Sequence, residues 1–364
     1  MNIDLTGQRV ALIGGAGFIG HNIALQLQKL GAKPHVIDSL QVNNLGAFTN
    51  GLIENSDSKQ YVGFINERLN LLRHAEIPLH IVDARDYPLL SRHLGAISPH
   101  VVIHLAAIAH ANRANKDPYS TFDHSLRTLE NALDSVRDQK PHFIYFSSSM
   151  VYGNFESDTV SEDSPCEPLG IYGALKFAGE KLVLAYHQVF DLSYTILRPS
   201  ALYGERCVSR RVGQAFIENA IRGRDIIING DGTETLDFTY INDLVQGVVL
   251  CIAKKEARNQ IFNLTYGSAR SLNCMAELLQ LHFPGVRVLH HPRDRLMPER
   301  GTLNIAKARK LLGYEPAFPL ERGFVAYIQW YKELAAESPA PFELGSLRQA
   351  QVAKWRRVPR AGRG

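Results

Sequence analysis

The segment Val10–Gly20, with the sequence VALIGGAGFIG, constrains the fold of this chain more than any other stretch. A short apolar run ends in glycines at positions 14, 15, 17 and 20, and apolar residues then recur at helical spacing as far as Leu30. This pattern predicts a strand, a tight turn and a helix. Because glycine has no Cβ, the backbone of such a turn can approach a diphosphate, whose charge then faces the unpaired N–H groups of the new helix.

The spacing of these glycines and the next acidic residue point to a dinucleotide. Gly15, Gly17 and Gly20 fit the pattern G-x-G-x-x-G, and Asp38 ends the following apolar run, 18 residues after Gly20. A carboxylate at that position accepts hydrogen bonds from ribose hydroxyls and repels a 2′-phosphate, so the sequence favours NAD over NADP. Glycines also occur where a helix packs tightly on a strand, but the flanking periodicity and Asp38 favour the cofactor interpretation.

Strand and helix patterns alternate through the first half of the chain, which predicts a Rossmann-like, doubly wound parallel sheet. Beyond residue 198 the alternation loosens, and we expect a smaller α+β lobe that covers the carboxyl ends of the strands. The expected strands of the sheet are 10–13, 35–37, 79–82, 101–105, 142–146 and 194–197. In the lobe we expect helices near 211–222, 242–253, 271–282 and 319–336, with short strands such as 226–228 and 261–263. The expected units are therefore an NAD-binding domain at 1–198, to which some later segments return, and a substrate lobe at 199–336.

Charge and cysteine content bear on the partners of the chain. The net charge is +4, but residues 338–364 alone carry +5, so we expect 337–364 to be a basic, flexible tail on a nearly neutral body. The four cysteines form no CxxC pair, and no histidine spacing is typical of a metal site, so we expect a reducing compartment and no metal. No apolar run approaches 18 residues, and no signal-peptide pattern is present, so we expect a cytoplasmic protein with no membrane or nucleic-acid partner.

Candidate reactive residues follow the fifth expected strand. Ser147, Ser148 and Ser149 come directly after it, and Tyr172 and Lys176 lie four residues apart near the start of the next helix. That spacing places the phenol and the ammonium on one face of the helix. A nearby cation and an oxidised nicotinamide both lower the pKa of a phenol, so such a pair can take a proton from an alcohol while a hydride leaves for the cofactor. A single Tyr-x-x-x-Lys pair also occurs by chance on amphipathic helices.

Several motifs in order carry a family resemblance: the glycine turn, HLAA at 104–107, SSSMVYG at 147–153, YGALK at 172–176, RPSALYG at 198–204 and LDFTYINDL at 236–244. Together they resemble the extended short-chain dehydrogenase/reductases, and within these the NAD-dependent nucleotide-sugar epimerases and dehydratases. The resemblance runs from about Arg9 to Lys332. It implies Tyr172 as the base, Lys176 as its ribose-binding partner and Ser148 as the third catalytic residue, with Ser149 as the alternative. It also implies a homodimer.

The expected cofactor residues lie in the glycine turn, at the strand ends and in the catalytic pair. They are Gly14, Gly17, Phe18, Ile19, Gly20, Asp38, Ser39, Asp83, Ala84, Leu105, Ala106, Ala107, Tyr172 and Lys176. For Asp83 two roles stay open, because its carboxylate can hold the adenine amino group or cap the following helix.

Departures from the family pattern narrow the reaction. The 4,6-dehydratases typically carry Asp-Glu directly after the catalytic hydroxyl, and the decarboxylases of UDP-glucuronate usually carry Glu where this chain has Met150. Here the two residues are Ser149 and Met150, which cannot serve as the acid and base for removing water. A 4-epimerase needs neither carboxylate, so we expect a 4-epimerase of a UDP-hexose or UDP-uronate. The alternatives are a decarboxylase, another nucleotide-sugar dehydratase or oxidoreductase, and a non-catalytic NAD-binding sensor.

Other departures affect the phosphate ligands. Leu236 stands where the family usually has an arginine that binds the diphosphate, and Ala201 stands where it usually has a phosphate-binding asparagine. His124 stands where the family usually has an asparagine in a helix. Something else must therefore balance two phosphate charges. Arg206, Arg210, Arg211, Arg293, Arg295 and Arg300 are the candidates, and we expect Arg206 and one of Arg293 or Arg295 to bind the substrate together with Ser148, Ser149 and Tyr172.

Overall fold

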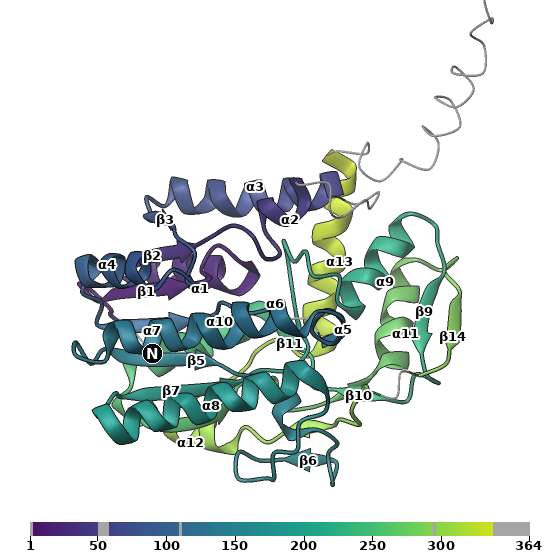
Figure 1. Ribbon diagram of the computed structural model, residues 1–364. Coiled ribbons are helices and arrows are strands. Elements are labelled where there is room, and N and C mark those ends of the chain that lie inside the picture. The colour runs from purple at the N-terminus through teal and green to yellow at the C-terminus, as the bar shows by residue number, and fades with distance from the viewer. Residues whose placement is uncertain (1–2, 50–57, 109–110, 294–295, 338–364) are drawn as a thin grey trace, which may run out of the picture.

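Seven parallel strands form the central sheet of the computed structural model (Figure 1), in the order β12-β7-β5-β4-β1-β2-β3. The structure describes residues 3–49, 58–108, 111–293 and 296–337. The strands are β1 (Arg9–Ile13), β2 (Lys33–Asp38), β3 (Leu79–Ile81), β4 (Val101–His104), β5 (His142–Phe146), β7 (Tyr194–Arg198) and β12 (Gln260–Asn263). Every residue of β4, β5 and β7 is buried, because helices cover both faces of the sheet.

The helices form two layers around this sheet (Figure 1). One layer packs α4, α7 and α8 over a core of aliphatic and aromatic side chains, and the other packs α1, α3, α10 and α12. Their bounds are α1 (Phe18–Lys29), α3 (Ser58–His74), α4 (Tyr87–Ile97), α7 (Thr128–Val136), α8 (Gly170–Phe190), α10 (Ile241–Ala253) and α12 (Ala306–Leu312). The predicted doubly wound α/β fold is thereby confirmed. Its strand order reverses between β1 and β4, which opens a crevice at their carboxyl ends.

Strand β12 lies in a different place from the one we expected. The sequence analysis assigned residues 261–263 to the smaller lobe, but the structure pairs them in parallel with β7, as the seventh strand of the main sheet. The chain thus returns to the first domain after it has entered the lobe. Helix α10 returns too, because it packs against α1. A short helix, α2 (Leu45–Thr49), lies between β2 and α3.

The remaining elements form the smaller lobe and the edges of the pocket. The helices are α5 (Ala111–Lys116), α6 (Pro118–Phe122), α9 (Val212–Ile221), α11 (Leu272–His282) and α13 (Leu320–Glu337), with the π-helical turn η1 (Asp123–Arg127) and the 3-10 turns η2 (Ser149–Tyr152) and η3 (Lys255–Ala257). Short strand pairs complete it: β6 (Thr159–Val160) with β15 (Thr302–Leu303), β8 (Leu202–Tyr203) with β11 (Thr239–Tyr240), β9 (Ile226–Asn229) with β14 (Val288–His291), and β10 (Thr235–Leu236) with β13 (Arg270–Ser271).

A buried carboxylate joins the two parts of the molecule. Glu218 of α9 is fully buried and accepts hydrogen bonds from Tyr61 of α3 at 2.7 Å and from Tyr331 of α13 at 2.9 Å. Gln214, on the same helix, donates a third bond at 2.8 Å. Three helices from both parts of the fold therefore share one acceptor.

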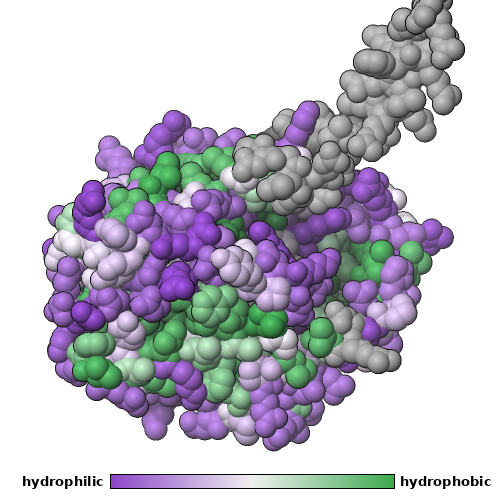
Figure 2. All heavy atoms as spheres, viewed as in Figure 1, coloured by the Kyte–Doolittle hydropathy of each residue, from purple (hydrophilic) through white to green (hydrophobic). Residues whose placement is uncertain are grey.

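The surface has one feature that bears on assembly. Hydrophobic residues gather in a band on the face that carries α6 and α8 (Figure 2), and Tyr119 and Phe122 of α6 are 83% and 45% exposed. None of the helices in the described part of the chain combines the length and the apolar character that a bilayer crossing needs. The tail expected at 337–364 lies outside the described residues from position 338 onward.

Candidate active site

Glycines set the distances between β1, β4 and α1. Gly14 has a φ of +80°, and a Cβ on it would lie 2.7 Å from the backbone nitrogen of Ala106. A Cβ on Gly20 would lie 2.5 Å from the backbone of Gly15, so α1 packs directly on the turn. Only glycine allows these approaches, which bring the amino end of α1 and the carboxyl end of β4 to one pocket.

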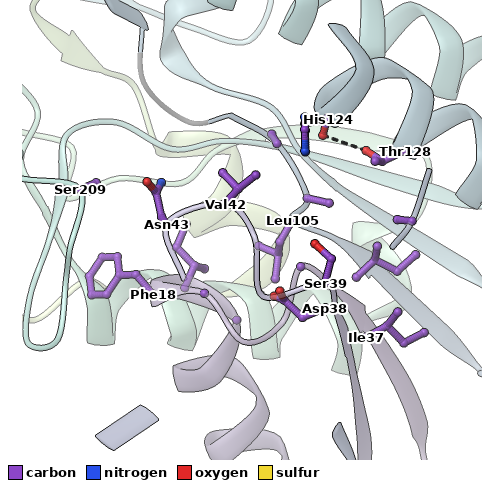
Figure 3. Close-up of a pocket in the computed structure, with 18 of the residues that line it drawn as sticks. Phe18, Ile37, Asp38, Ser39, Val42, Asn43, Leu105, His124, Thr128 and Ser209 are labelled. Carbon is purple, nitrogen blue, oxygen red and sulfur yellow. Dashed lines mark hydrogen bonds between the residues drawn. The ribbon is translucent and has the colours of Figure 1, made fainter. Parts of the chain in front are cut away.

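That pocket lies beyond the carboxyl ends of the central strands (Figure 3). Figure 3 shows Asp38 and Ser39 at the end of β2, with His124 and Thr128 farther along the pocket wall. Twelve of the residues expected from the sequence to contact the cofactor line it: Gly14, Gly17, Phe18, Ile19, Gly20, Asp38, Ser39, Asp83, Ala84, Leu105, Ala106 and Ala107. The other two, Tyr172 and Lys176, are not among the residues that line the pocket. Arg211, from the smaller lobe, does line it.

The chemistry of this pocket fits a dinucleotide. A Cβ on Gly17 would meet only the Gly14 carbonyl, at 3.4 Å, so the space in front of the turn is open. Gly17 is the N-cap of α1 and no side chain caps the helix, so its first N–H groups are available to a diphosphate. Asp38 accepts backbone N–H bonds from Ala16 at 3.0 Å and Leu40 at 2.7 Å, and burial raises its pKa. Each oxygen keeps a lone pair for a ribose hydroxyl.

The geometry of Asp83 excludes one of its two expected roles, that of the helix cap. Helix α4 is capped by Asp86, which accepts from the Leu89 N–H at 3.0 Å, so Asp83 is not the cap. Asp83 instead forms an ion pair with Arg85 at 2.6 Å, and its hydrogen bonds with Arg85 lower its pKa. Asp83 and the neighbouring Ala84 both line the pocket.

Ser148 at the start of η2 and Tyr172 in the first turn of α8 lie near each other. Ser148 caps η2, and its Oγ accepts the Met150 N–H at 3.2 Å, which leaves its own proton free to be donated. Burial raises the pKa of Tyr172, whereas the charge of Arg211 and a hydrogen bond with Ser148 lower it. The start of α8 is held by Asn115 of α5, which accepts the Ile171 N–H at 3.0 Å. The phenol is thus placed by three separate segments.

Lys176 is held in a buried position at the end of β5. Its Nζ donates to the carbonyl of Phe146 at 2.6 Å, at the end of β5, and the side chain is buried. Burial lowers the pKa of Lys176 to about 8, and the charge of Glu180 partly opposes this. The charge of Arg211 also lowers the pKa of Tyr172. The expected effect of Lys176 on the phenol stays a prediction.

A buried polar network joins the segments that carry these residues. Arg198 of β7 forms a two-pronged ion pair with Glu180 of α8, at 2.9 and 2.7 Å, and Ser147 donates to the same carboxylate at 2.6 Å. Arg198 also donates to the Tyr152 hydroxyl at 2.9 Å, which donates to Asn263 of β12 at 2.7 Å. Ser147 and Tyr152 therefore tie β5, β7, β12 and α8 together.

Comparison with known proteins now identifies the family. The model of the NAD-dependent epimerase/dehydratase family matches residues 10–265. The chain belongs to this family. A relative is the putative UDP-glucose 4-epimerase of Methanocaldococcus jannaschii, 29% identical over 337 residues, with 89% of this chain and 98% of the relative covered. UDP-glucuronate 4-epimerase 1 of Arabidopsis thaliana is 28% identical over 350 residues, covering 89% and 77%.

A solved structure supports the same assignment. UDP-glucuronic acid 4-epimerase from Bacillus cereus, in complex with UDP-glucuronic acid and NAD, superposes with a TM-score of 0.78. Its sequence is 27% identical, and the match covers 90% of this chain and all of that one. The resemblance inferred from the motifs is confirmed, and this member of the NAD-dependent epimerase/dehydratase family is an enzyme that uses NAD.

The arginines that we expected to bind the substrate have the following surroundings in this family member. Arg206 forms an ion pair with Glu67 of α3 at 2.7 Å and lies over Trp330, and it does not line the pocket. Arg293 lies 3.8 Å from both Glu234 and Glu299. Arg295 lies outside the described residues. Ser149 is almost completely buried, and its N–H donates to the Pro199 carbonyl at 2.9 Å.

His124 lies in a π-helical turn that lines the pocket. Its Nδ1 bonds to the Ser120 carbonyl at 2.9 Å, and its own carbonyl accepts from Thr128 Oγ1 at 3.0 Å (Figure 3). The backbone carbonyl of Ser120 thus holds the imidazole ring in place. The extra residue in the turn was not predicted, because single-turn π-helices leave no sequence periodicity.

Arg68 of α3 is a pocket residue that the sequence analysis missed. It is 1% exposed, donates through Nε to the Arg206 carbonyl at 2.9 Å and through Nη2 to the same oxygen, and has no partner for Nη1. Burial lowers its pKa to about 10. A signal was present, since Arg68 lies midway between Phe64 and Leu72 on the buried stripe of the helix. Among the described residues, no group of three His, Cys, Asp or Glu side chains is arranged to hold a metal.

Proposed function

We propose that this enzyme is a nucleotide-sugar 4-epimerase that acts on a UDP-hexose or UDP-uronate. The observation that carries the proposal is that Ser148 and Tyr172 lie near each other, with no carboxylate at the two positions after Ser148. Ser149 and Met150 fill those positions, and both are buried. The relatives named as UDP-glucose and UDP-glucuronate 4-epimerases support the same substrate class.

In this proposal each side chain has a distinct task. Bound NAD supplies the capacity to accept a hydride and to return it. Tyr172 takes the proton of the sugar hydroxyl at C4, and Ser148 donates a hydrogen bond to the same oxygen. Lys176 stays charged beside the Phe146 carbonyl and holds a ribose hydroxyl. Gly14, Gly17, Phe18, Ile19 and Gly20 receive the diphosphate of NAD, and Asp38 and Ser39 receive its adenosine ribose.

A panel assay tests the reaction. The purified enzyme is incubated with UDP-glucose, UDP-galactose, UDP-N-acetylglucosamine, UDP-glucuronate and UDP-galacturonate, and the products are identified by NMR. We expect inversion at C4 of at least one sugar without net formation of NADH. Release of carbon dioxide from UDP-glucuronate would instead indicate a decarboxylase, and stoichiometric NADH an oxidoreductase. NAD binding with no turnover on any sugar would indicate a sensor.

The pKa of Lys176 predicts the alkaline limit of this activity. Because that pKa is about 8, the ammonium is charged below pH 8 and loses its charge above it. We expect kcat/KM to be level between pH 6 and 7.5 and to fall about tenfold for each unit above pH 8. The exposed Lys181, on the same helix, provides the control, and Lys181→Met should leave the profile unchanged. A level profile up to pH 9.5 would contradict the role of the ammonium.

Assembly and location follow as further parts of the proposal. We propose a homodimer, and the hydrophobic band around α6 and α8 supports it (Figure 2). The four cysteines, Cys166, Cys207, Cys251 and Cys274, are free thiols, which supports a reducing compartment and hence the cytoplasm.

A further inference from the structure

Arg300 has its backbone fixed between the two parts of the fold. Its carbonyl accepts a hydrogen bond from Thr235 Oγ1 of β10 at 2.9 Å. On either side of it, the Glu299 carbonyl accepts the Phe155 N–H at 2.8 Å, and the Thr302 N–H donates to Asp158 at 2.8 Å. The segment 155–158 belongs to the connection that leads from η2 to α8. Arg300 is therefore held between the strand that carries Leu236 and the chain that leads to Tyr172.

The two charged residues that lower the pKa of Arg300 are both arginines, Arg211 and Arg293. The Nε of Arg300 is completely buried and has no hydrogen-bond partner, and no carboxylate of the described residues lies within ion-pair distance. Burial and the neighbouring charges of Arg211 and Arg293 lower its pKa to about 10. Arg293 lies 3.8 Å from Glu234, the residue before Thr235, so both arginines lie against the same short segment. A buried guanidinium nitrogen without an acceptor is unfavourable unless a ligand binds there.

The buried arginine of the structural network shows the contrast. Arg198 uses its nitrogens on Glu180, Tyr152 and the Glu162 carbonyl, so its charge is compensated within the protein. Arg300 has no such set of acceptors. A guanidinium that is fixed by its backbone and lacks acceptors is arranged for an external anion, and its fork of N–H groups matches phosphate oxygens.

The position of Leu236 explains why this arginine is needed. Leu236 follows Thr235, whose hydroxyl holds the Arg300 carbonyl, and an aliphatic side chain offers a phosphate no hydrogen bond. We propose that Arg300, with Arg211 and Arg293 beside it, binds the diphosphate of the nucleotide sugar. In this proposal Arg300, in the segment before β15, supplies the positive charge that Leu236 of β10 cannot supply. The inference rests on the proposed function only for the nature of the substrate.

Binding of free nucleotides to the NAD-loaded enzyme tests this role. Dissociation constants for UDP, UMP and uridine are measured by calorimetry for the parent and for Arg300→Met. We expect UDP to bind about 10- to 100-fold more weakly to the variant, UMP at most about fivefold more weakly, and uridine unchanged. Arg287→Met is the matched control, because Arg287 is an exposed arginine of the same lobe, paired with Asp225 at 2.7 Å. It should leave all three constants unchanged.

A rescue variant separates ligand binding from a structural role. In the double variant Arg300→Met/Leu236→Arg, a guanidinium returns to the same site from β10, and UDP affinity should recover to within about fivefold of the parent. If the Met variant does not fold, Arg300→Lys keeps the charge with a single donor group and should weaken UDP about 3- to 10-fold.

Two results would overturn the inference: UDP affinity within threefold of the parent in Arg300→Met, or an equal loss for UDP, UMP and uridine. The measurement is independent of turnover. If UDP binding depends on Arg300 but no sugar is epimerised, the proposed function fails and this inference stands.

Discussion

Replacing Tyr172 by phenylalanine is expected to lower kcat about 10³-fold while NAD remains bound. The change removes one hydroxyl, which in the proposed mechanism is the only group that takes the proton from the sugar at C4. General acid–base catalysis by a positioned side chain contributes roughly 10²- to 10⁴-fold, so the loss should fall in the upper part of this range. The backbone of α8 and the Asn115 contact that fixes its first turn are unaffected by the change.

The measurement needs a readout for the cofactor as well as for the sugar. NAD content per chain is determined after denaturation, and epimerisation is followed by NMR in the same preparation. Tyr186→Phe is the matched control, because Tyr186 lies on the same helix and packs against Phe190, and we expect it to keep full activity. Retention of more than a tenth of the activity in Tyr172→Phe would remove the phenol from the mechanism.

Replacing Glu180 by leucine should lower the free energy of unfolding by about 3 to 5 kcal/mol. Glu180 and Arg198 are both almost fully buried and share two hydrogen bonds, at 2.9 and 2.7 Å, while Ser147 donates a third to the carboxylate. Removal of one partner leaves the guanidinium charge buried and uncompensated, which costs far more than the pair itself contributes. Urea denaturation followed by circular dichroism measures the difference.

An exposed pair of similar length provides the comparison for this prediction. Glu321 and Arg270 lie 2.8 Å apart at the surface, and Glu321→Leu should cost no more than about 1 kcal/mol. The double variant Glu180→Leu/Arg198→Met removes both charges and should regain most of the stability lost in the single variant. If Glu180→Leu is no less stable than Glu321→Leu, the buried network does not hold the sheet and α8 together.

The parts of the fold that the sequence predicted well are those determined by local patterns. The glycine turn follows from positions 14 to 20, and the strand ends at Asp38 and Asp83 follow from short apolar runs, so twelve expected pocket residues lie around one pocket. The pairing of Glu180 with Arg198 was not predicted, because the two residues are 18 positions apart and nothing in the spacing joins them.

The arginines at the substrate end show where such prediction stops. We expected Arg206 to bind the substrate, but its side chain pairs with Glu67, 139 positions earlier in the chain. Arg300 was one of six candidates, and only the folded chain reveals that it lacks acceptors. The seventh strand was misplaced for the same reason, since residues 261–263 read as a short strand whether they join the main sheet or the lobe.

The shared acceptor at Glu218 has a consequence for the proposed inversion of a sugar. Tyr61 and Tyr331 donate to it from opposite parts of the molecule, so any widening of the space between these parts would break bonds to a carboxylate that water does not reach. We therefore expect the separation of the two parts to stay the same during the proposed reaction. In that case a sugar ring that presents its other face to the cofactor would have to rotate about its own bonds to the diphosphate.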